Sequence, residues 1–215
     1  WDSFGRMFDE DGCAELPWLV IPGNHEIEPD MLSGQAFLPY RRRWKTPEVQ
    51  PEQVASDFEV RNWATYDFKG RFDFGGSFYG ARIGPAHFVA LNPYTETHAG
   101  SAQQAWLRSE LATVARGETP FLIALTHAPF RHTSVKHQSA EEIATQGLQR
   151  MAEPLLIDAR ADFVLSGHVH AYERIAPVSG VRHFIVGNGG NLEGLYGEWL
   201  ESNISEYRSG EHYGW

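Results

Sequence analysis

Three short apolar runs of this sequence each end in side chains that can bind a metal ion. Residues 18–21 are followed by Asn24 and His25, residues 121–125 by His127, and residues 163–165 by His168 and His170. Short apolar runs bounded by turn residues are typical of buried strands. Ligands of open α/β sheets bind at the carboxyl ends of the strands, and neighbouring strands lie about 5 Å apart. We therefore expect these donors to surround one point at one edge of a sheet.

The rest of the pattern predicts one layered α/β domain over residues 1–215, because strands and helices alternate through most of the chain. Two further strands, 77–83 and 86–92, are joined through Gly84 and Pro85, which is a hairpin signal. Another apolar run lies at 183–186. Helices are expected at 3–13, 36–44, 101–115 and from 139 to about 159. The last two open with Ser-x-x-Gln and Ser-x-x-Glu capping boxes, and the polar stretch 45–62 is interpreted as a long surface loop.

Charge and cysteine content exclude several classes of function. The net charge of −10 argues against a general binder of nucleic acids or anionic membranes, since both partners need a basic face. The single basic run, Arg-Arg-Arg at 41–43, is interpreted as a solvated helix face. Cys13 is the only cysteine, so the chain has neither an internal disulfide nor a cysteine-rich zinc site. No run approaches the roughly 20 apolar residues of a membrane span.

The histidine pair in Gly-His-Val-His at 167–170 is the strongest sign of a metal site. Residues two apart on an extended backbone point the same way, so His168 and His170 are expected to face one point. Amide oxygen and imidazole without thiolate suit a catalytic Zn, Fe or Mn ion. An isolated H-x-H would more often be two surface histidines, but three converging runs favour the metal site. The glycine-rich residues 187–190 either bring backbone close to this site or form a simple turn.

In this order the motifs resemble those of a known family. Gly-Asn-His-Glu at 23–26, the strand end at 125–127 and Gly-His-Val-His-Ala-Tyr-Glu-Arg at 167–174 look like three of the five motifs of calcineurin-like metallophosphoesterases. They are most similar to purple acid phosphatases of the plant and fungal type, with supporting stretches at 1–6, 100–107 and 187–191. The resemblance implies an α/β fold, namely a layered metallophosphoesterase-type β-sheet sandwich flanked by helices, here incomplete at both ends.

The resemblance also implies a dinuclear metal centre that holds Fe(III) and a divalent Zn, Mn or Fe ion. By motif, Asn24, His127 and His168 would ligate the divalent ion, and His170 would ligate the ferric ion. The family's first two motifs, D-x-G and G-D-x-x-Y, are not found before Asn24; Asp-Phe-Gly at 73–75 follows it and is rejected. Those motifs supply the bridging carboxylate and the remaining ligands. We therefore expect a fragment lacking both ends, with weak single-metal binding at best and no useful turnover by these residues alone.

Two further histidines receive roles from the same resemblance. His25 would contact the substrate phosphate. The histidine that protonates the leaving alcohol is best matched by His137, with His132 a weaker match, although a solvated loop histidine is nearly as good an interpretation of His137.

The activity implied for the intact protein is hydrolysis of small phosphate monoesters at acidic pH, with two cations about 3.5–4 Å apart clamping the phosphate. Two alternatives stay open: a phosphodiesterase or protein phosphatase with the same metal core, and a non-catalytic fragment or pseudoenzyme used for binding or storage. The resemblance further implies a secreted or vacuolar-type compartment. The glycosylation triplet at Asn203 gives that expectation weak support.

Overall fold

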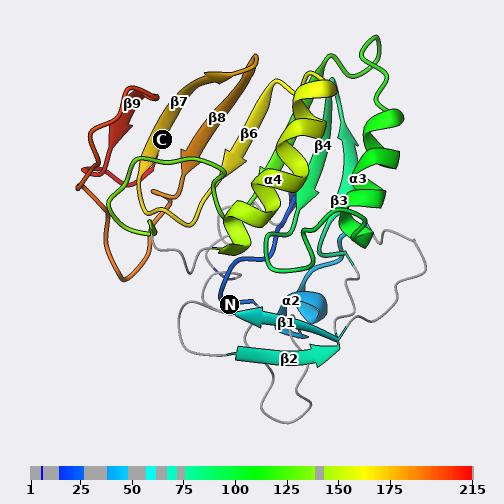
Figure 1. The fold of residues 1–215 in the computed structure, drawn as a ribbon, viewed down its shortest axis with the longest axis horizontal. Helices are drawn as coiled ribbons and strands as arrows, with labels where there is room; N and C mark the ends of the chain where they lie inside the picture. The colour runs from blue at the N-terminus through cyan, green and yellow to red at the C-terminus, as the bar shows by residue number, and fades with distance from the viewer. Residues whose placement is uncertain are drawn as a thin grey trace.

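Most described strands of the protein form one mixed sheet. The computed structural model describes residues 6, 15–26, 38–47, 57–61, 67–71, 76–138 and 143–214. The strands of this sheet are β3 (Tyr79–Ile83), β4 (Ala86–Leu91), β5 (Phe121–Thr126), β6 (Phe163–Ser166), β7 (Tyr172–Val178), β8 (Val181–Val186) and β9 (Ser205–Ser209). They lie in the order β3-β4-β5-β6-β8-β7-β9 (Figure 1).

The direction of the central strands decides where a site can form. β4, β5, β6 and β8 run parallel to one another, while β3 pairs antiparallel with β4, and β7 lies antiparallel between β8 and β9. The predicted strands at 121–125, 163–165 and 183–186, and the hairpin at 77–92, are confirmed. The carboxyl ends of the parallel strands therefore meet at one edge of the sheet, as the sequence predicts.

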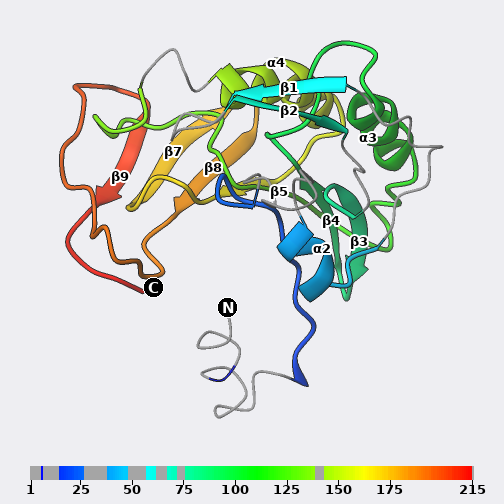
Figure 2. The same ribbon diagram turned by 90° about the horizontal axis from the view of Figure 1, so that it is seen from below.

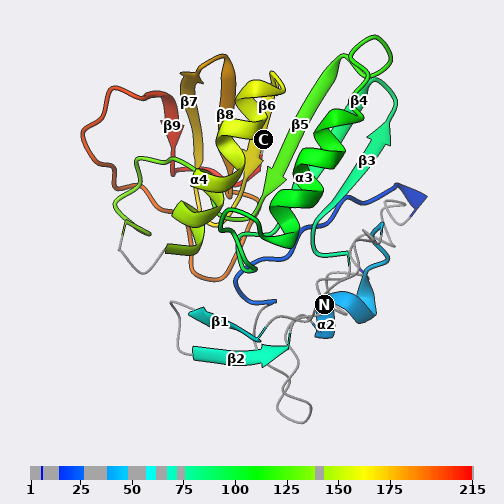
Figure 3. The same cartoon turned by 45° about the vertical axis from the view of Figure 1, so that its right-hand side comes forward.

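Two helices, α3 (Ala102–Ala112) and α4 (Ile143–Asp158), cover one face of this sheet (Figure 3). The interface buries Leu122 of β5, Leu107 of α3 and Leu148 of α4, each with 0% exposure. In β5, buried residues alternate with partly exposed ones, so that this strand turns one face to the core. Residues 15–26 and α2 (Leu38–Arg43) lie on the other side of the sheet from α3 and α4 (Figure 2).

Ser101 caps α3 as predicted, but the returning bond of the capping box goes to Gly100 instead of Ser101. The Ser101 Oγ atom accepts a hydrogen bond from the Gln104 backbone N–H at 3.3 Å, and the Gln104 side chain accepts one from the Gly100 N–H at 2.8 Å. The second box, at Ser139 and Glu142, lies outside the described residues, and α4 is described from Ile143 onward. The helix predicted at 3–13 is outside them too, apart from Arg6, as is Asp-Phe-Gly at 73–75.

Three expectations about elements are corrected. Residues 17–23 form no strand; the Val20 carbonyl instead accepts hydrogen bonds from the hydroxyls of Tyr40 and Tyr79, at 3.1 and 2.8 Å. Part of the predicted loop at 45–62 is β1 (Asp57–Arg61), which pairs antiparallel with β2 (Asp67–Arg71). β7 and β9 are strands that the apolar pattern did not predict, because β9 in particular is mostly polar and none of its residues is fully buried. No helix in the described ranges has the length and apolar character to cross a membrane.

Candidate functional site

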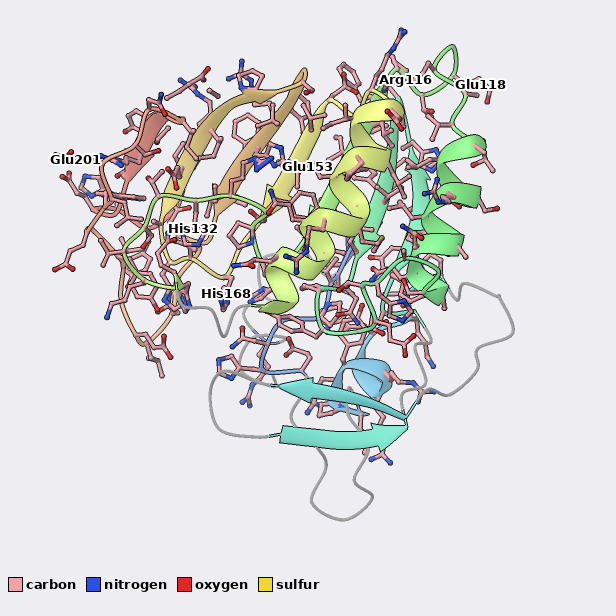
Figure 4. The ribbon with its side chains drawn as sticks, in the orientation of Figure 1. Arg116, Glu118, His132, Glu153, His168 and Glu201 are labelled. Carbon is pink, nitrogen blue, oxygen red and sulfur yellow. The ribbon has the colours of Figure 1, made fainter. Side chains whose placement is uncertain are left out.

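The carboxyl ends of β5 and β6 bring two of the predicted histidines side by side. Thr126 and Ser166, the last residues of these strands, are register partners, and the Gly167 N–H donates to the His127 carbonyl at 2.9 Å. The rings of His127 and His168 that follow have centroids 5.1 Å apart, nearly edge to face. In Figure 4, His168 lies at this end of the sheet, whereas Arg116 and Glu118, which precede β5, lie at the opposite end.

Asn24 joins these histidines from a segment that is distant in sequence. Its side chain is 4% exposed, and its Oδ1 atom lies 2.8 Å from His127 Nε2. Glu26 Oε2 closes the preceding turn by accepting from the Gly23 N–H at 2.7 Å. A Cβ atom at position 23 would lie 3.1 Å from His127 Cε1, so glycine allows the close approach. The Gly-Asn-His-Glu motif is therefore a turn that delivers the asparagine amide to the sheet edge.

The backbone of Gly-His-Val-His differs from the extended form that the sequence suggested. His168 has a φ of 64°, in the left-handed region, and two successive tight turns are closed by Val169 N to Gly167 O and Ala171 N to Val169 O, both 2.7 Å. His168 is 7% exposed and faces His127. His170 packs its ring on Tyr196, at 4.5 Å between centroids and an interplanar angle of 22°. His168 and His170 thus reach one region because two tight turns direct the backbone, and not because alternate residues of a strand point the same way.

The glycine-rich residues 187–190 bring backbone against this motif. Gly187 donates to the Ala171 carbonyl at 3.1 Å, and a Cβ atom on Gly187 would sit 1.9 Å from the Val169 carbonyl oxygen. Residues 188 and 189 then form a turn. Both interpretations of the glycine run are therefore correct, with close approach at its first residue and a turn after it.

Of the two loop histidines considered for the leaving group, His137 is the one that contacts the motif. Its ring centroid lies 4.2 Å from that of His168 and 5.6 Å from that of Tyr196. His132 contacts Gln138, whose Nε2 atom lies 3.4 Å from the His132 ring. His25 is exposed on the turn that carries Asn24. The conformation of the loop brings His137 against His168, a difference from His132 that sequence position alone does not explain.

The imidazoles lie close enough to affect one another's ionisation. Desolvation by the surrounding protein lowers the pKa of His127 to about 3. The neighbouring imidazoles that act in the same direction are those of His168, His25, His170 and His137. All the predicted histidines of the site are therefore in electrostatic range of His127, which stays neutral at ordinary pH. Neutral imidazole is the form that binds a metal ion.

Tyr196 and Glu193 complete the environment of His170. Burial lowers the pKa of His170, and the Glu193 carboxylate opposes this from 3.8 Å. Burial also raises the pKa of Tyr196 to about 12, and its hydroxyl donates to Glu193 at 3.2 Å. Sequence reasoning missed both residues as neighbours of His170. No sequence signal locates them, because the contact depends on how residues 191–200 fold back, with Tyr196 N donating to the His170 carbonyl at 2.9 Å.

The donor chemistry at this edge fits a cation. Asn24 Oδ1 lies 2.8 Å from His127 Nε2, so an amide oxygen and an imidazole, both donor types that bind catalytic Zn, Fe or Mn ions, are adjacent here. Among the described residues, however, no three His, Cys, Asp or Glu side chains meet in an arrangement that could hold a metal ion. The described residues therefore supply an amide oxygen and several imidazoles, of which that of His127 is neutral, and this set is incomplete.

Comparison with known proteins agrees with this geometry. The family described as calcineurin-like phosphoesterase matches residues 1–172. The chain is 35% identical to purple acid phosphatase 22 of Arabidopsis thaliana over 97% of its own length and 44% of that protein. It is 31% identical to the Fe(3+)-Zn(2+) purple acid phosphatase 12 of the same plant, over 94% of its own length and 42% of that protein. It thus spans less than half the length of these relatives.

The solved structure of the purple acid phosphatase PPD1 from yellow lupin seeds has the same fold. It superposes with a TM-score of 0.67 at 20% identity, covering 91% of this chain and 35% of the lupin chain. The seven-stranded mixed sheet with flanking helices is thus the fold implied by the sequence motifs. With the family match over residues 1–172 and the similarity to plant relatives, the chain belongs to the calcineurin-like phosphoesterases, in their purple acid phosphatase group.

Proposed function

We propose that this protein hydrolyses small phosphate monoesters at acidic pH with a dinuclear metal centre. The observation that carries the proposal is the convergence of Asn24, His127 and His168 at the carboxyl edge of β5 and β6, with His137 packed against His168. The carboxyl edge of parallel strands, where these side chains meet, is where α/β proteins bind ligands. Membership of the phosphoesterase family supports a phosphate ester as the substrate class.

Fe(III) and a divalent ion are the metals we propose, supported by the name of the Arabidopsis Fe(3+)-Zn(2+) relative. Asn24, His127 and His168 would hold the divalent ion, and His170 would contribute to the ferric site. Bound there, the two cations would supply positive charge that polarises the phosphoryl group and acidifies a water molecule. The neutral state of His127 fits this role because a protonated ring could not bind.

The remaining histidines act on the substrate itself. His25, exposed on its turn, would donate a hydrogen bond to a phosphoryl oxygen and stabilise the charge that develops there. His137 would hold a proton on the imidazole and deliver it to the leaving alkoxide as general acid. Its packing against His168 places it beside the proposed metal-binding residues. Tyr196 would limit water access on the His170 side of the site, since it stacks on that ring.

These 215 residues alone are proposed to bind one metal ion weakly and to show no useful turnover. The acidic motifs that would bridge the two ions, D-x-G and G-D-x-x-Y, do not precede Asn24 in the sequence. A secreted or vacuolar-type compartment is part of the proposal. It is supported by the exposure of Asn203, where a glycan would be attached.

The test uses the protein expressed from the complete coding sequence that contains this chain. His168→Ala and Asn24→Ala are compared with the wild type, with bound metal measured by elemental analysis and turnover measured on a monoester and a diester. His98→Ala is the matched control, because His98 is a 64% exposed histidine outside the site. We expect both site variants to lose bound metal and monoester turnover, and the control to keep both.

Three outcomes would replace the proposal. Near-normal monoester hydrolysis by His168→Ala and Asn24→Ala would show that these residues do not form the centre. A wild type that binds metal and prefers the diester would be a phosphodiesterase, and one that binds no metal and turns over neither ester would be a binding protein or pseudoenzyme.

A further inference from the structure

We infer that Glu173 is a positioning residue: it anchors the loop 127–138 so that His137 lies against His168. The inference rests on the function proposed above for His137, but the anchoring itself can be measured without activity. Glu173 belongs to the Ala-Tyr-Glu-Arg end of the histidine motif, to which sequence analysis gave no role.

The contact between Glu173 and the loop is fully buried. Glu173 has 0% exposure on β7, and Thr133 of the loop has 2%. The two carboxylate oxygens both bind Thr133: Oε2 accepts from the backbone N–H at 2.8 Å, and Oε1 accepts from the hydroxyl. A buried carboxylate is costly unless it is hydrogen-bonded, so removal of the acid would leave two buried donors of Thr133 without this acceptor.

Contacts around Thr133 extend this anchor along the loop. The Thr133 hydroxyl also accepts from Arg208 of β9 at 3.0 Å, and its carbonyl accepts from the Leu200 N–H at 2.7 Å. Val135 N donates to the Glu198 carbonyl at 3.0 Å. The segment 133–135 is thus fixed on one side by β7 and β9 and on the other by residues 198–200, and the buried acid lies at the centre of these contacts.

Short local bonds then carry the chain from Thr133 to His137. Lys136 N donates to Ser134 Oγ at 3.2 Å, and the Gln138 side chain donates to the Ser134 carbonyl at 2.7 Å. His137 has a φ of 62°, a left-handed conformation that is unfavourable for a non-glycine residue. Because such a conformation persists only where its surroundings impose it, release of Thr133 should let His137 leave His168.

A second carboxylate binds the same loop without reaching this segment. Glu153 of α4 accepts from Arg131 at 2.6 Å, on the side of the loop nearest β5. Removing one partner of a buried polar pair is destabilising, because the other partner is left without its bonds. The contacts of Glu173 hold the loop in position, and a control variant has to separate that effect from a general loss of stability.

The experiment compares Glu173→Ala with Glu173→Gln in the protein expressed from the complete coding sequence. The glutamine amide can still accept from the Thr133 N–H and donate to its hydroxyl, so it should restore the loop. Glu110→Ala is the matched control, because Glu110 accepts from a buried histidine, His87, at 2.7 Å on α3 and does not contact the loop. Thr133→Val and Thr133→Ser repeat the test from the other partner, in case Glu173→Ala does not fold.

Two readouts are taken. The first is hydrogen exchange of the amides at 133–137, with the β5 amides as internal reference. The second is kcat for glycerol 2-phosphate, whose alkoxide needs a proton to leave, against kcat for 4-nitrophenyl phosphate, whose phenolate leaves without one. In Glu173→Ala and Thr133→Val, we expect the amides at 133–137 to exchange faster than in the wild type. We also expect kcat for glycerol 2-phosphate to fall at least about tenfold more than kcat for 4-nitrophenyl phosphate. Glu173→Gln, Thr133→Ser and Glu110→Ala should keep the wild-type ratio.

The outcomes separate the two inferences. Unchanged exchange at 133–137 in Glu173→Ala and Thr133→Val, or equal loss of kcat on both esters, would overturn the positioning role. If His137→Ala itself loses both esters equally, the general-acid role of His137 fails, while faster exchange at 133–137 would still establish the anchor. If Glu110→Ala changes the ratio of the two kcat values as much as Glu173→Ala does, the change reflects a general loss of stability. That outcome would also overturn the inference.

Discussion

Gly187 and Gly189 are two residues apart in one turn, yet they have different reasons to be glycine. A Cβ atom on Gly187 would lie 1.9 Å from the Val169 carbonyl oxygen and 2.8 Å from its carbon, whereas one on Gly189 would meet nothing within 4 Å. The clash is with backbone, so no side-chain rotation can relieve it. At this position the chemistry of the site depends on the absence of a side chain, because Val169 lies between His168 and His170.

We expect Gly187→Ala to lower the free energy of unfolding by about 1–3 kcal/mol, as overpacking of a tight contact does. Displacement of Val169 should also weaken metal binding and turnover, because both neighbouring histidines would move. Urea unfolding and metal content check this, with Gly189→Ala as the matched control. Equal stability of the two variants would contradict the contact at Gly187.

His183 gives a second prediction at the scale of a residue. It is 2% exposed on β8, and burial, then the nearby Arg131 guanidinium, lower its pKa from 6.5 to about 4. Glu153 Oε1 is the facing carboxylate, 3.6 Å from Nε2. Because the folded pKa is the lower one, the unfolded chain binds more protons between pH 4 and pH 6.5, and stability falls as the pH falls through that window.

We expect the wild type to lose roughly 3 kcal/mol relative to His183→Gln between pH 6.5 and pH 4, and nothing relative to it above pH 6.5. Urea unfolding of both proteins over this pH range measures the difference. Parallel curves for the two proteins would show that His183 does not remain neutral in the folded state.

Residues of the candidate site could be predicted from the sequence to different degrees. His127 and His168 could be predicted because each follows a short apolar run, and parallel strands bring their carboxyl ends together. Asn24 was predicted from the same pattern, although the apolar run before it forms no strand. Tyr196 and Thr133 could not be predicted, because each reaches the site through a loop whose course is set by hydrogen bonds to distant segments. The left-handed φ of His168 was likewise hidden, since the pattern of the motif also suits an extended strand.

At the scale of elements, α3 holds the end of β4 through a buried amide. Gln103 is 1% exposed; its Oε1 accepts from the Asn92 N–H at 2.7 Å, and its Nε2 donates to the Asn92 carbonyl at 2.9 Å. Asn92 follows β4 directly, at the same edge of the sheet as His127. Helix α3 therefore supplies the hydrogen-bond partners of the Asn92 N–H and carbonyl, which a neighbouring strand does not supply.

We expect Gln103→Leu to destabilise the protein by about 2 kcal/mol, because both backbone groups of Asn92 lose a buried partner. Ser101→Ala should cost about 1 kcal/mol through loss of the helix cap. Ser109→Ala, exposed on the same helix, should change little. Thermal and urea unfolding check the order of the three variants, and a neutral Gln103→Leu would contradict the clamp.

Elements with strong local signals were predictable, and those that depend on tertiary contacts were not. Helix α3 has its capping residues and a buried stripe, and β5 has an apolar run. Residues 18–21 are equally apolar, but the Val20 carbonyl is bound by the hydroxyls of two tyrosines instead of a neighbouring strand. β9 has the opposite character, a polar edge strand that exists because β7 offers it a partner.

At the scale of the whole molecule, the proposed metal ligands tie together segments from both ends of the described chain. Residues 15–26, which carry Asn24, lie on the side of the sheet away from α3 and α4 (Figure 2), whereas His168 lies at the sheet edge (Figure 4), and His127 directly follows β5. A cation bound by all three would replace the Asn24–His127 hydrogen bond and would add to the link that Tyr79 of β3 makes to the Val20 carbonyl. Binding would therefore stabilise the folded state as a whole, since an unfolded chain does not assemble the ligands.

We expect added zinc to raise the melting temperature of the metal-free protein, and EDTA to reverse the rise. At a free zinc concentration 100 times the dissociation constant, the gain in free energy of unfolding is about 2.7 kcal/mol. Asn24→Ala and His168→Ala should lose most of this gain, because each removes a ligand, and His98→Ala should keep it, because its ring is 64% exposed away from the site. This measurement needs no turnover, so it tests the metal site separately from the phosphatase activity. An equal rise in all four proteins would mean that zinc binds elsewhere, and that Asn24 and His168 meet at the sheet edge for structural reasons.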